Sequence, residues 1–168
     1  MTEMIALPLE TLTDLEQTLH AEIPLTRAMG VRVVRADHHG LVLSAALAPN
    51  LNHKQTAFGG SLNSLATLAC WGMIQLLVRD CGRAITVVIQ ESHVQFLKPV
   101  TQDFEAVCPL PPAPVIEKFL RILERKGRAR LELDSTIHAD GEIACRFHGK
   151  FVAYDRLRFQ GFDPTSIV

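Results

Sequence analysis

The residues best suited to chemistry lie in one stretch, NHKQTAFGGSLNSLATLACWGMIQLL, which runs from Asn52 to Leu77. Gly59 and Gly60 open a long apolar segment there, and Ser61 follows them directly. The first N–H groups of a helix lack partners within the helix, and the helix dipole makes that end partly positive. Because glycine leaves these groups uncovered, the amides at this helix start are candidate donors to an oxygen that gains negative charge during a reaction.

Small polar side chains continue this pattern into the predicted helix. Asn63 and Thr67 are four residues apart and share one helix face, and Ser64 and Trp71 lie on an adjacent stripe. Polar groups therefore gather at the helix start, and apolar groups follow, which predicts a pocket with a polar mouth and an apolar interior. The alternative is purely structural: Ser61 caps a tight helix entry, and the hydroxyls bond to the preceding helical turn.

A second polar cluster, QESH, interrupts an apolar strand predicted over residues 84–99. Under regular alternation, both faces of this strand become polar at the same level, whereas a half-buried strand is polar on one face only. Glu91 and His93 are two residues apart and point to the same side, so they are candidates for an acid–base pair. The alternative is a stretch exposed to solvent or in contact with another subunit.

Length, composition and charge limit the classes of function. The chain has 168 residues, 48% of them hydrophobic, and a formal net charge of −1. These values support one domain with a hydrophobic core, and they argue against a general affinity for nucleic acid or anionic membranes. The amino terminus lacks the basic leader of a signal peptide, and we expect no membrane span.

The cysteines predict a cytoplasmic protein without a metal site. They show no metal-ligand spacing with histidine, and most of them lie in apolar surroundings, as reduced thiols in a protein core do. They are Cys70, Cys81, Cys108 and Cys145.

Hydrophobic periodicity predicts the elements that position these residues. Helices are expected over 9–23, 61–79 and 115–126, and strands over 30–37, 40–49, 84–99, 101–108, 128–137 and 143–153. Only helix 61–79 is apolar nearly all round, and most strands have one apolar face. A curved antiparallel sheet wrapped around this single helix satisfies both requirements, which is an α+β architecture. Because such a sheet leaves edge strands uncovered, we expect a dimer.

The block FGGSLNSLATLA, preceded by an asparagine-containing loop and followed by a strand that closes in HVQFLKPV, resembles the hotdog-fold thioesterase superfamily. The likeness runs from about Leu25 to Tyr154. It is greatest to the thioesterase domain family that occurs alone or fused behind an acetyltransferase domain. The resemblance implies a single hotdog domain over 1–168, with a lead-in over 1–24, a core over 25–155 and a tail over 156–168.

The resemblance also implies an assembly and a substrate. Proteins of this superfamily form homodimers, which often pair again into homotetramers, and their active sites lie at the dimer interface. The implied substrate is an acyl group on coenzyme A or on an acyl-carrier protein, and no cofactor other than this carrier is expected.

Residue by residue, the match is incomplete. Gly59 and Gly60 match the glycines of the family's H-G-G motif, and Asn52 matches a polar loop residue that lies near the thioester. Phe58, however, stands where many relatives have histidine, and Thr67 stands about where many relatives carry a catalytic Asp or Glu. An uncharged hydroxyl cannot act as a carboxylate base, so another group must supply that chemistry.

These observations predict a hydrolase that cleaves acyl thioesters. The carbonyl oxygen would bind the amides of Gly60 or Ser61, and Asn52, Asn63 or Thr67 would hold the attacking water. General-base help would come from Glu91 or His93 of the partner subunit, or from His53 in the loop. The residues expected to bind substrate are His53, Phe58, Gly59, Ser64 and Trp71.

Two other classes of function stay open. The first is an acyl-thioester-binding module without turnover, which the missing helix carboxylate favours. The second is a hydratase or dehydratase on the same fold, which normally needs a histidine and an acidic residue around this helix. The helix predicted here supplies neither of these residues.

Overall fold

The structure is a computed structural model that describes residues 9–158. The predicted lead-in residues 1–8 and tail residues 159–168 lie outside this range. In chain order the elements are α1 (Leu9–Glu22), α2 (Leu25–Met29), β1 (Arg32–Asp37), β2 (Gly40–Ala45), η1 (Ala48–Asn50), α3 (Gly59–Val78), β3 (Ile85–Phe96), β4 (Phe104–Pro109), α4 (Ala113–Lys126), β5 (Arg128–Ala139) and β6 (Glu142–Asp155).

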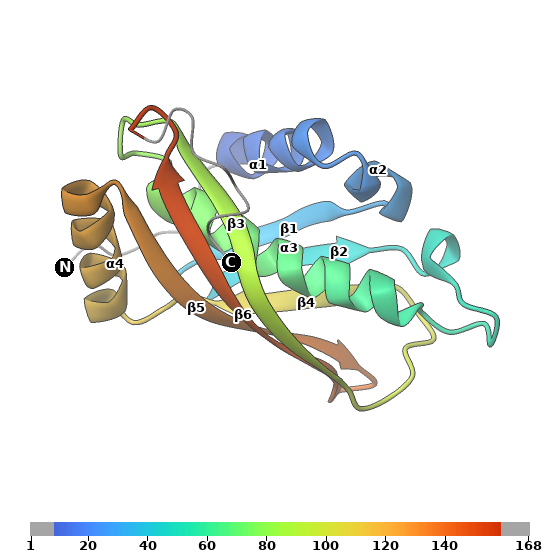
Figure 1. Ribbon diagram of the computed structural model, residues 1–168. Helices are drawn as coiled ribbons and strands as arrows, with labels where there is room; N and C mark the ends of the chain where they lie inside the picture. Colours follow the sequence, from blue (N-terminus) through green and yellow to red (C-terminus); the bar gives the residue numbers. More distant parts are fainter. Residues whose placement is uncertain (1–8, 159–168) are drawn as a thin grey trace.

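The strands form one six-stranded antiparallel sheet in the order β1-β2-β4-β5-β6-β3. The sheet curves around α3, and α4 flanks the sheet beside β5 (Figure 1). This is the α+β architecture predicted from the single all-apolar helix and the half-buried strands. β3 and β1 are the two edge strands.

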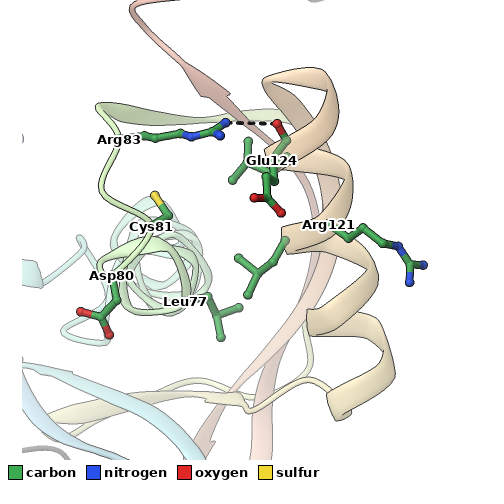
Figure 2. A pocket seen from close by; sticks show the side chains of 8 residues that line it. Leu77, Asp80, Cys81, Arg83, Arg121 and Glu124 are labelled. Carbon is green, nitrogen blue, oxygen red and sulfur yellow. Dashed lines mark hydrogen bonds between the residues drawn. The ribbon is translucent and has the colours of Figure 1, made fainter.

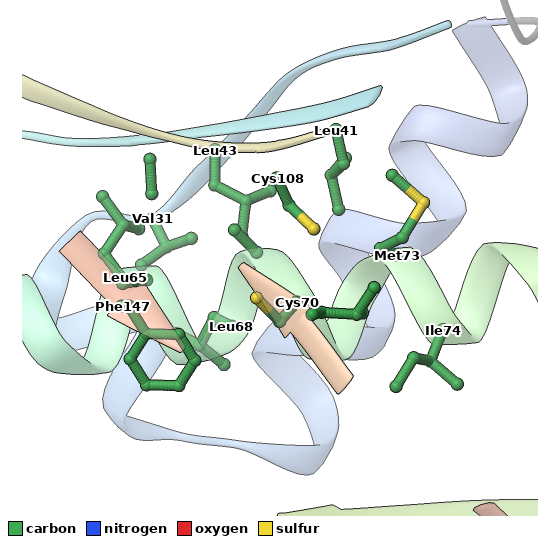
Figure 3. Packing of buried hydrophobic residues seen from close by; sticks show 14 of the residues in the cluster. Val31, Leu41, Leu43, Leu65, Leu68, Cys70, Met73, Ile74, Cys108 and Phe147 are labelled. Atoms are coloured by element: carbon green, nitrogen blue, oxygen red, sulfur yellow. The ribbon is translucent and has the colours of Figure 1, made fainter. Parts of the chain in front are cut away.

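The core lies between α3 and the concave face of the sheet. Leu65 and Met73 of α3 pack with Leu41 of β2 and Phe147 of β6, and all four are almost fully buried (Figure 3). The buried Ser135 hydroxyl of β5 donates a hydrogen bond of 2.9 Å to Ala66 O of α3. This hydrogen bond between sheet and helix gives the buried Ser135 hydroxyl a partner.

Alone among the described helices, α3 is long and apolar enough to cross a membrane. However, 61% of its most apolar window is buried inside the protein. This burial is typical of the core helix of a globular domain.

The two edge strands differ in how they are covered. α1 packs against β1, where the Glu16 carboxylate accepts a hydrogen bond of 2.8 Å from the Val33 N–H and pairs with Arg32 at 3.0 Å. β3 has β6 on one side, and no described strand pairs with its other side. Uncovered edge strands readily pair with further strands. The sheet therefore has one edge blocked by its own chain and one edge open.

A β-bulge in β3 makes the predicted alternation of this strand wrong. Ile89 is opposite Phe151 and Glu91 is opposite Lys150, so Gln90 is an extra residue between two regular pairs. An extra residue reverses which face the following side chains take. Ile89 and Val94 therefore share the concave face toward α3, and Glu91 lies on the convex face.

Candidate functional site

The backbone at the start of α3 leaves two amides free. Phe58 has extended dihedral angles, and its carbonyl accepts the Ser61 N–H at 2.9 Å and the Leu62 N–H at 3.1 Å. Within residues 9–158, the Gly59 and Gly60 N–H groups donate to no protein acceptor. The expectation that Gly60 offers a donor agrees with this geometry. The expectation for Ser61 does not, because the short first turn uses its N–H.

A loop fixed at both ends holds this helix start in place. The Phe58 N–H donates to Asn50 O at 2.7 Å, and the Ala57 N–H donates to Val100 O at 2.7 Å. Asn50 is buried, and its Nδ2 donates to Met29 O at 2.8 Å and to Ala46 O at 2.7 Å. Sequence reasoning missed Asn50, although an asparagine directly after a proline is a frequent signal of a turn.

The Asn52 side chain, which was expected to hold the attacking water, forms hydrogen bonds within its own loop. Its Nδ2 donates to Thr56 Oγ1 at 2.8 Å, and its Oδ1 accepts the Lys54 N–H at 2.8 Å and the Thr56 N–H at 3.2 Å. Both ends of the amide are therefore occupied, and Asn52 shapes the loop that leads to the glycine pair. His53 lies exposed in the same loop.

Two aromatic rings flank the glycines. A Cβ built on Gly59 would lie 3.5 Å from the ring of Phe96, and a Cβ on Gly60 would overlap the ring of Phe58. Both rings are more than half exposed, 57% for Phe58 and 52% for Phe96. Large exposed aromatic side chains beside free backbone donors are typical of a binding surface. Phe96 was not among the predicted site residues, although it opens the F-L-K-P run noted in the sequence.

The hydroxyls of the helix donate to the preceding turn. Ser64 Oγ donates to Gly60 O and Thr67 Oγ1 donates to Asn63 O, each at 2.8 Å. This is the structural alternative that the sequence left open for these two residues. Their oxygens keep lone pairs, so each can still accept a hydrogen bond from water or from a ligand.

Asn63 differs from its neighbours on the helix. Its side-chain Oδ1 is buried and has no hydrogen-bond partner, and it is the only such buried side-chain atom among the described residues. Leaving a buried acceptor unpaired costs about 1–3 kcal/mol. Such a cost in a native protein commonly marks a group that acts on a ligand or a water.

Trp71 joins α3 to the edge strand. Its indole Nε1 donates to Val87 O of β3 at 3.1 Å, and its ring is half-buried. At helical spacing, Gly60, Ser64, Thr67 and Trp71 lie on one stripe, and all four are only partly buried. This stripe follows the open side of the helix, next to the uncovered edge of the sheet.

Glu91 and His93 are not brought to the glycine pair. They are opposite Lys150 and His148, on the convex face of the sheet, whereas Val94 of the same strand faces α3 with the buried Phe147. Glu91 Oε2 accepts a bond of 3.4 Å from Lys150 Nζ. Edge-to-edge pairing of two antiparallel strands keeps each face on its own side, so a second subunit would not turn these side chains inward. The structure therefore does not support their expected role as bases.

A cavity of about 320 Å³ adjoins the helix start at Gly59. Its wall consists of Ala57, Gly59, Leu62, Phe96, Leu97, Lys98, Pro99 and Val100. Most of these residues are apolar, so the free amide of Gly59 lies at the edge of an apolar hollow.

A second hollow, of about 400 Å³, lies between the end of α3 and α4 (Figure 2). Arg83 Nη1 donates to Glu124 O at 3.1 Å at its rim, and Arg121 points away from it. α3 has 20 residues, and at 1.5 Å per residue it spans roughly 30 Å. This hollow is therefore far from the glycine pair and belongs to a different part of the molecule.

Cys70 and Cys108 are buried thiols of the core. The Cys70 thiol beside Cys108 raises the pKa of the Cys108 thiol far above its ordinary value, and burial raises it further. A thiol that stays protonated is a poor nucleophile. These cysteines therefore pack the core and do not belong to the site.

Comparisons with known proteins identify the fold and the family. Residues 12–155 match the model of the family described as "Putative thioesterase (yiiD_Cterm)". A protein of unknown function from Chlorobaculum tepidum superposes with a TM-score of 0.84 at 32% identity, covering 88% of this chain and 96% of its own. A putative thioesterase from Shewanella oneidensis gives a TM-score of 0.77 at 29% identity, covering 86% and 98%.

A probable thioesterase from Pseudomonas aeruginosa is similar in fold, with a TM-score of 0.72 at 21% identity over 90% of this chain and 98% of its own. A six-stranded antiparallel sheet curved around one central helix is the hotdog fold. The family match covers residues 12–155 and includes both the glycine pair and the strands around it. The chain therefore belongs to the hotdog-fold thioesterase family described as yiiD_Cterm.

Proposed function

We propose that this protein hydrolyses acyl thioesters of coenzyme A or of an acyl-carrier protein at the start of α3. The observation that carries the proposal is the pair of unpartnered amides at Gly59 and Gly60, which no side chain of their own covers. A carbonyl oxygen placed on such amides gains stabilisation as it becomes an oxyanion. Losing one donor of this kind costs about 3–4 kcal/mol of transition-state stabilisation.

Water is the nucleophile in this mechanism. Asn63 Oδ1 or Thr67 Oγ1 accepts a hydrogen bond from one hydrogen of this water, the other hydrogen is directed at the His53 imidazole, and the water oxygen attacks the carbonyl carbon. The proton lost from water passes to His53, the ionisable group in the loop that leads into Gly59. When the C–S bond breaks, the thiol leaves with a proton from the same imidazole. General acid–base help of this type contributes roughly a hundred- to ten-thousandfold.

A second subunit completes this site. The open edge of β3 lies next to the half-buried stripe of α3, and Ile89, Phe96 and Leu97 are exposed there. Pairing of two β3 edges in a homodimer buries these side chains and closes the groove over the glycine pair. Two such dimers can pair again into a homotetramer through the charged convex faces of their sheets.

We also place this enzyme in the cytoplasm. All four cysteines are free thiols, and three of them are buried. Free thiols are typical of reducing compartments.

The test is hydrolysis of acyl-CoAs of graded chain length by the purified full chain, followed by release of free thiol. We expect turnover clearly above the uncatalysed rate for at least one chain length. The variant His53→Gln keeps a polar side chain without a base and should turn over about a hundredfold more slowly. Turnover of His53→Gln equal to that of the wild type would remove His53 from the mechanism.

A binding module without turnover is the second candidate. It is favoured by the absence of any carboxylate on α3 and by the use of the Thr67 hydroxyl proton within the helix. Calorimetry with the same acyl-CoAs separates the two candidates. Binding with hydrolysis no faster than background supports the module, and binding with turnover supports the enzyme.

A further inference from the structure

We propose that the cavity beside Gly59 receives the acyl chain and favours apolar acyl groups, with a gain per added methylene that ends at medium chain length. This inference rests on the proposed function, since it takes the thioester carbonyl to lie on the Gly59 and Gly60 amides. A carbonyl in that place has its acyl chain at the mouth of the cavity, because Gly59 forms part of the cavity wall.

The chemistry of the wall selects apolar chains. Leu62, Phe96, Leu97 and Val100 supply hydrocarbon surface, and Val100 and Leu62 are buried. Lys98 is the one charged residue of the wall, and its ammonium pairs with the Glu142 carboxylate at the rim. The ammonium therefore already has an anionic partner, and no other residue of the wall offers a cation to a carboxylate at the end of an acyl chain.

The volume of the cavity in the single chain gives an expected chain length. A cavity of about 320 Å³ holds roughly ten non-hydrogen atoms if each takes the volume of a water molecule in the liquid. An octanoyl group is close to this size. Each methylene up to that length is buried and can raise kcat/KM by up to about fourfold, and further methylenes remain in solvent and add nothing.

Phe96 of β3 is one of the residues that line the cavity. Its ring lies 3.5 Å from the position of a Gly59 Cβ, so it stands directly beside the free amide. Because this side chain is half exposed, it can be shortened without opening the core. Leu97 is also exposed and lines the same cavity, so a larger side chain there can fill it.

The experiment measures kcat/KM for saturated acyl-CoAs from acetyl to hexadecanoyl, and the dissociation constants of the same compounds by calorimetry. For the wild type we expect values that improve with chain length up to about octanoyl and then level off. The chain length at which the values level off is the break. Leu97→Trp fills the cavity and should move the break to shorter chains, and Phe96→Ala should move it to longer chains. Leu157→Trp places the same indole at an exposed leucine outside the cavity, and the break should stay in place.

The outcomes separate the two proposals. If no acyl-CoA is hydrolysed but the break appears in the dissociation constants and moves as expected, the hydrolase proposal fails and the acyl cavity stands. If hydrolysis occurs but Leu97→Trp and Phe96→Ala keep the wild-type break, the cavity does not hold the acyl chain and the inference is overturned. The absence of any length dependence in both measurements overturns it as well.

Discussion

Asn63 is a residue whose side chain should lower the free energy of unfolding and raise the activity. Its Oδ1 is buried without a partner, and this arrangement lowers the stability of the free protein. Removing an unpaired buried acceptor while keeping the side-chain volume relieves its desolvation cost. A purely structural asparagine has no reason to carry this cost, whereas an asparagine that holds the attacking water does.

Replacing Asn63 with leucine should therefore raise the free energy of unfolding by about 1–2 kcal/mol. The same change should lower kcat/KM roughly tenfold, because one hydrogen bond to the water is lost. Asn50→Leu is the matched control: Asn50 is buried with two hydrogen bonds satisfied, and its loss should destabilise the protein by about 2 kcal/mol or more. Urea unfolding monitored by circular dichroism measures both changes. An Asn63→Leu protein as destabilised as Asn50→Leu would contradict a functional role.

Single residues were the part that the sequence predicted least well. Helical spacing placed Asn63 and Thr67 on one face, because that follows from residue numbers alone. It could not tell that the Thr67 hydroxyl donates to Asn63 O while Asn63 Oδ1 stays unpaired. The engagement of Asn52 by its own loop was likewise hidden, since it depends on the path of residues 52–56.

Among the elements, α3 and β3 matter most, because the proposed site lies between them. Trp71 connects them through its bond to Val87 O and lies on the same half-buried stripe as Thr67. It is also the only tryptophan of the chain. Its fluorescence therefore reports on the half-buried stripe of α3 that lies beside β3.

Titration with an acyl-CoA should change the Trp71 emission, with a midpoint equal to the dissociation constant from calorimetry. The reason is that a ligand that extends along the half-buried stripe of α3 displaces water from the exposed part of the indole ring. Trp71→Phe should abolish the signal and, by removing one hydrogen bond, lower the free energy of unfolding by roughly 1 kcal/mol. Unchanged emission at a ligand concentration that saturates the calorimetric signal would place the ligand elsewhere.

Most elements could be predicted, except the short helix α2, the end of the strand predicted over 40–49, which stops at Ala45 before η1, and the faces of β3. The long apolar helix, the hairpin at His38 and His39, and the alternation of β5 and β6 all follow from local patterns and were confirmed. The faces of β3 were wrong, because a bulge at Gln90 reverses the alternation within the strand. Sequence alternation shows polar residues on both faces but cannot distinguish a bulge from a strand that is exposed on both sides.

At the scale of the whole molecule, the two sheet edges differ. Glu16 of α1 bonds to the β1 backbone at Val33, whereas the free side of β3 has no partner strand among the described residues. A long edge strand with exposed apolar side chains tends to pair with another copy. The assembly should therefore form through β3.

A charge at the open edge should break the assembly. Ile89→Lys places an ammonium on the concave side of β3 and should give a species of 18.6 kDa in sedimentation, whereas we expect the wild type to sediment as a dimer. Its activity should fall with the loss of the dimer, because the groove over the glycine pair is then open. Val34→Lys makes the same change at an equally exposed residue of β1 and should leave both the dimer and the activity intact. A wild-type monomer with full activity would contradict this account.

The most direct test of the central claim compares two variants that both add a Cβ at Gly60, only one of which keeps the amide proton. Proline is tolerated in the first helical turn, where the N–H has no helical acceptor. Gly60→Pro therefore removes the proposed oxyanion donor, and Gly60→Ala crowds the site but keeps the N–H. We measure kcat on octanoyl-CoA for both variants after checking that their melting temperatures agree. The account predicts that Gly60→Pro is at least about a hundredfold slower than Gly60→Ala. Equal rates within about threefold would show that this amide does not stabilise the transition state.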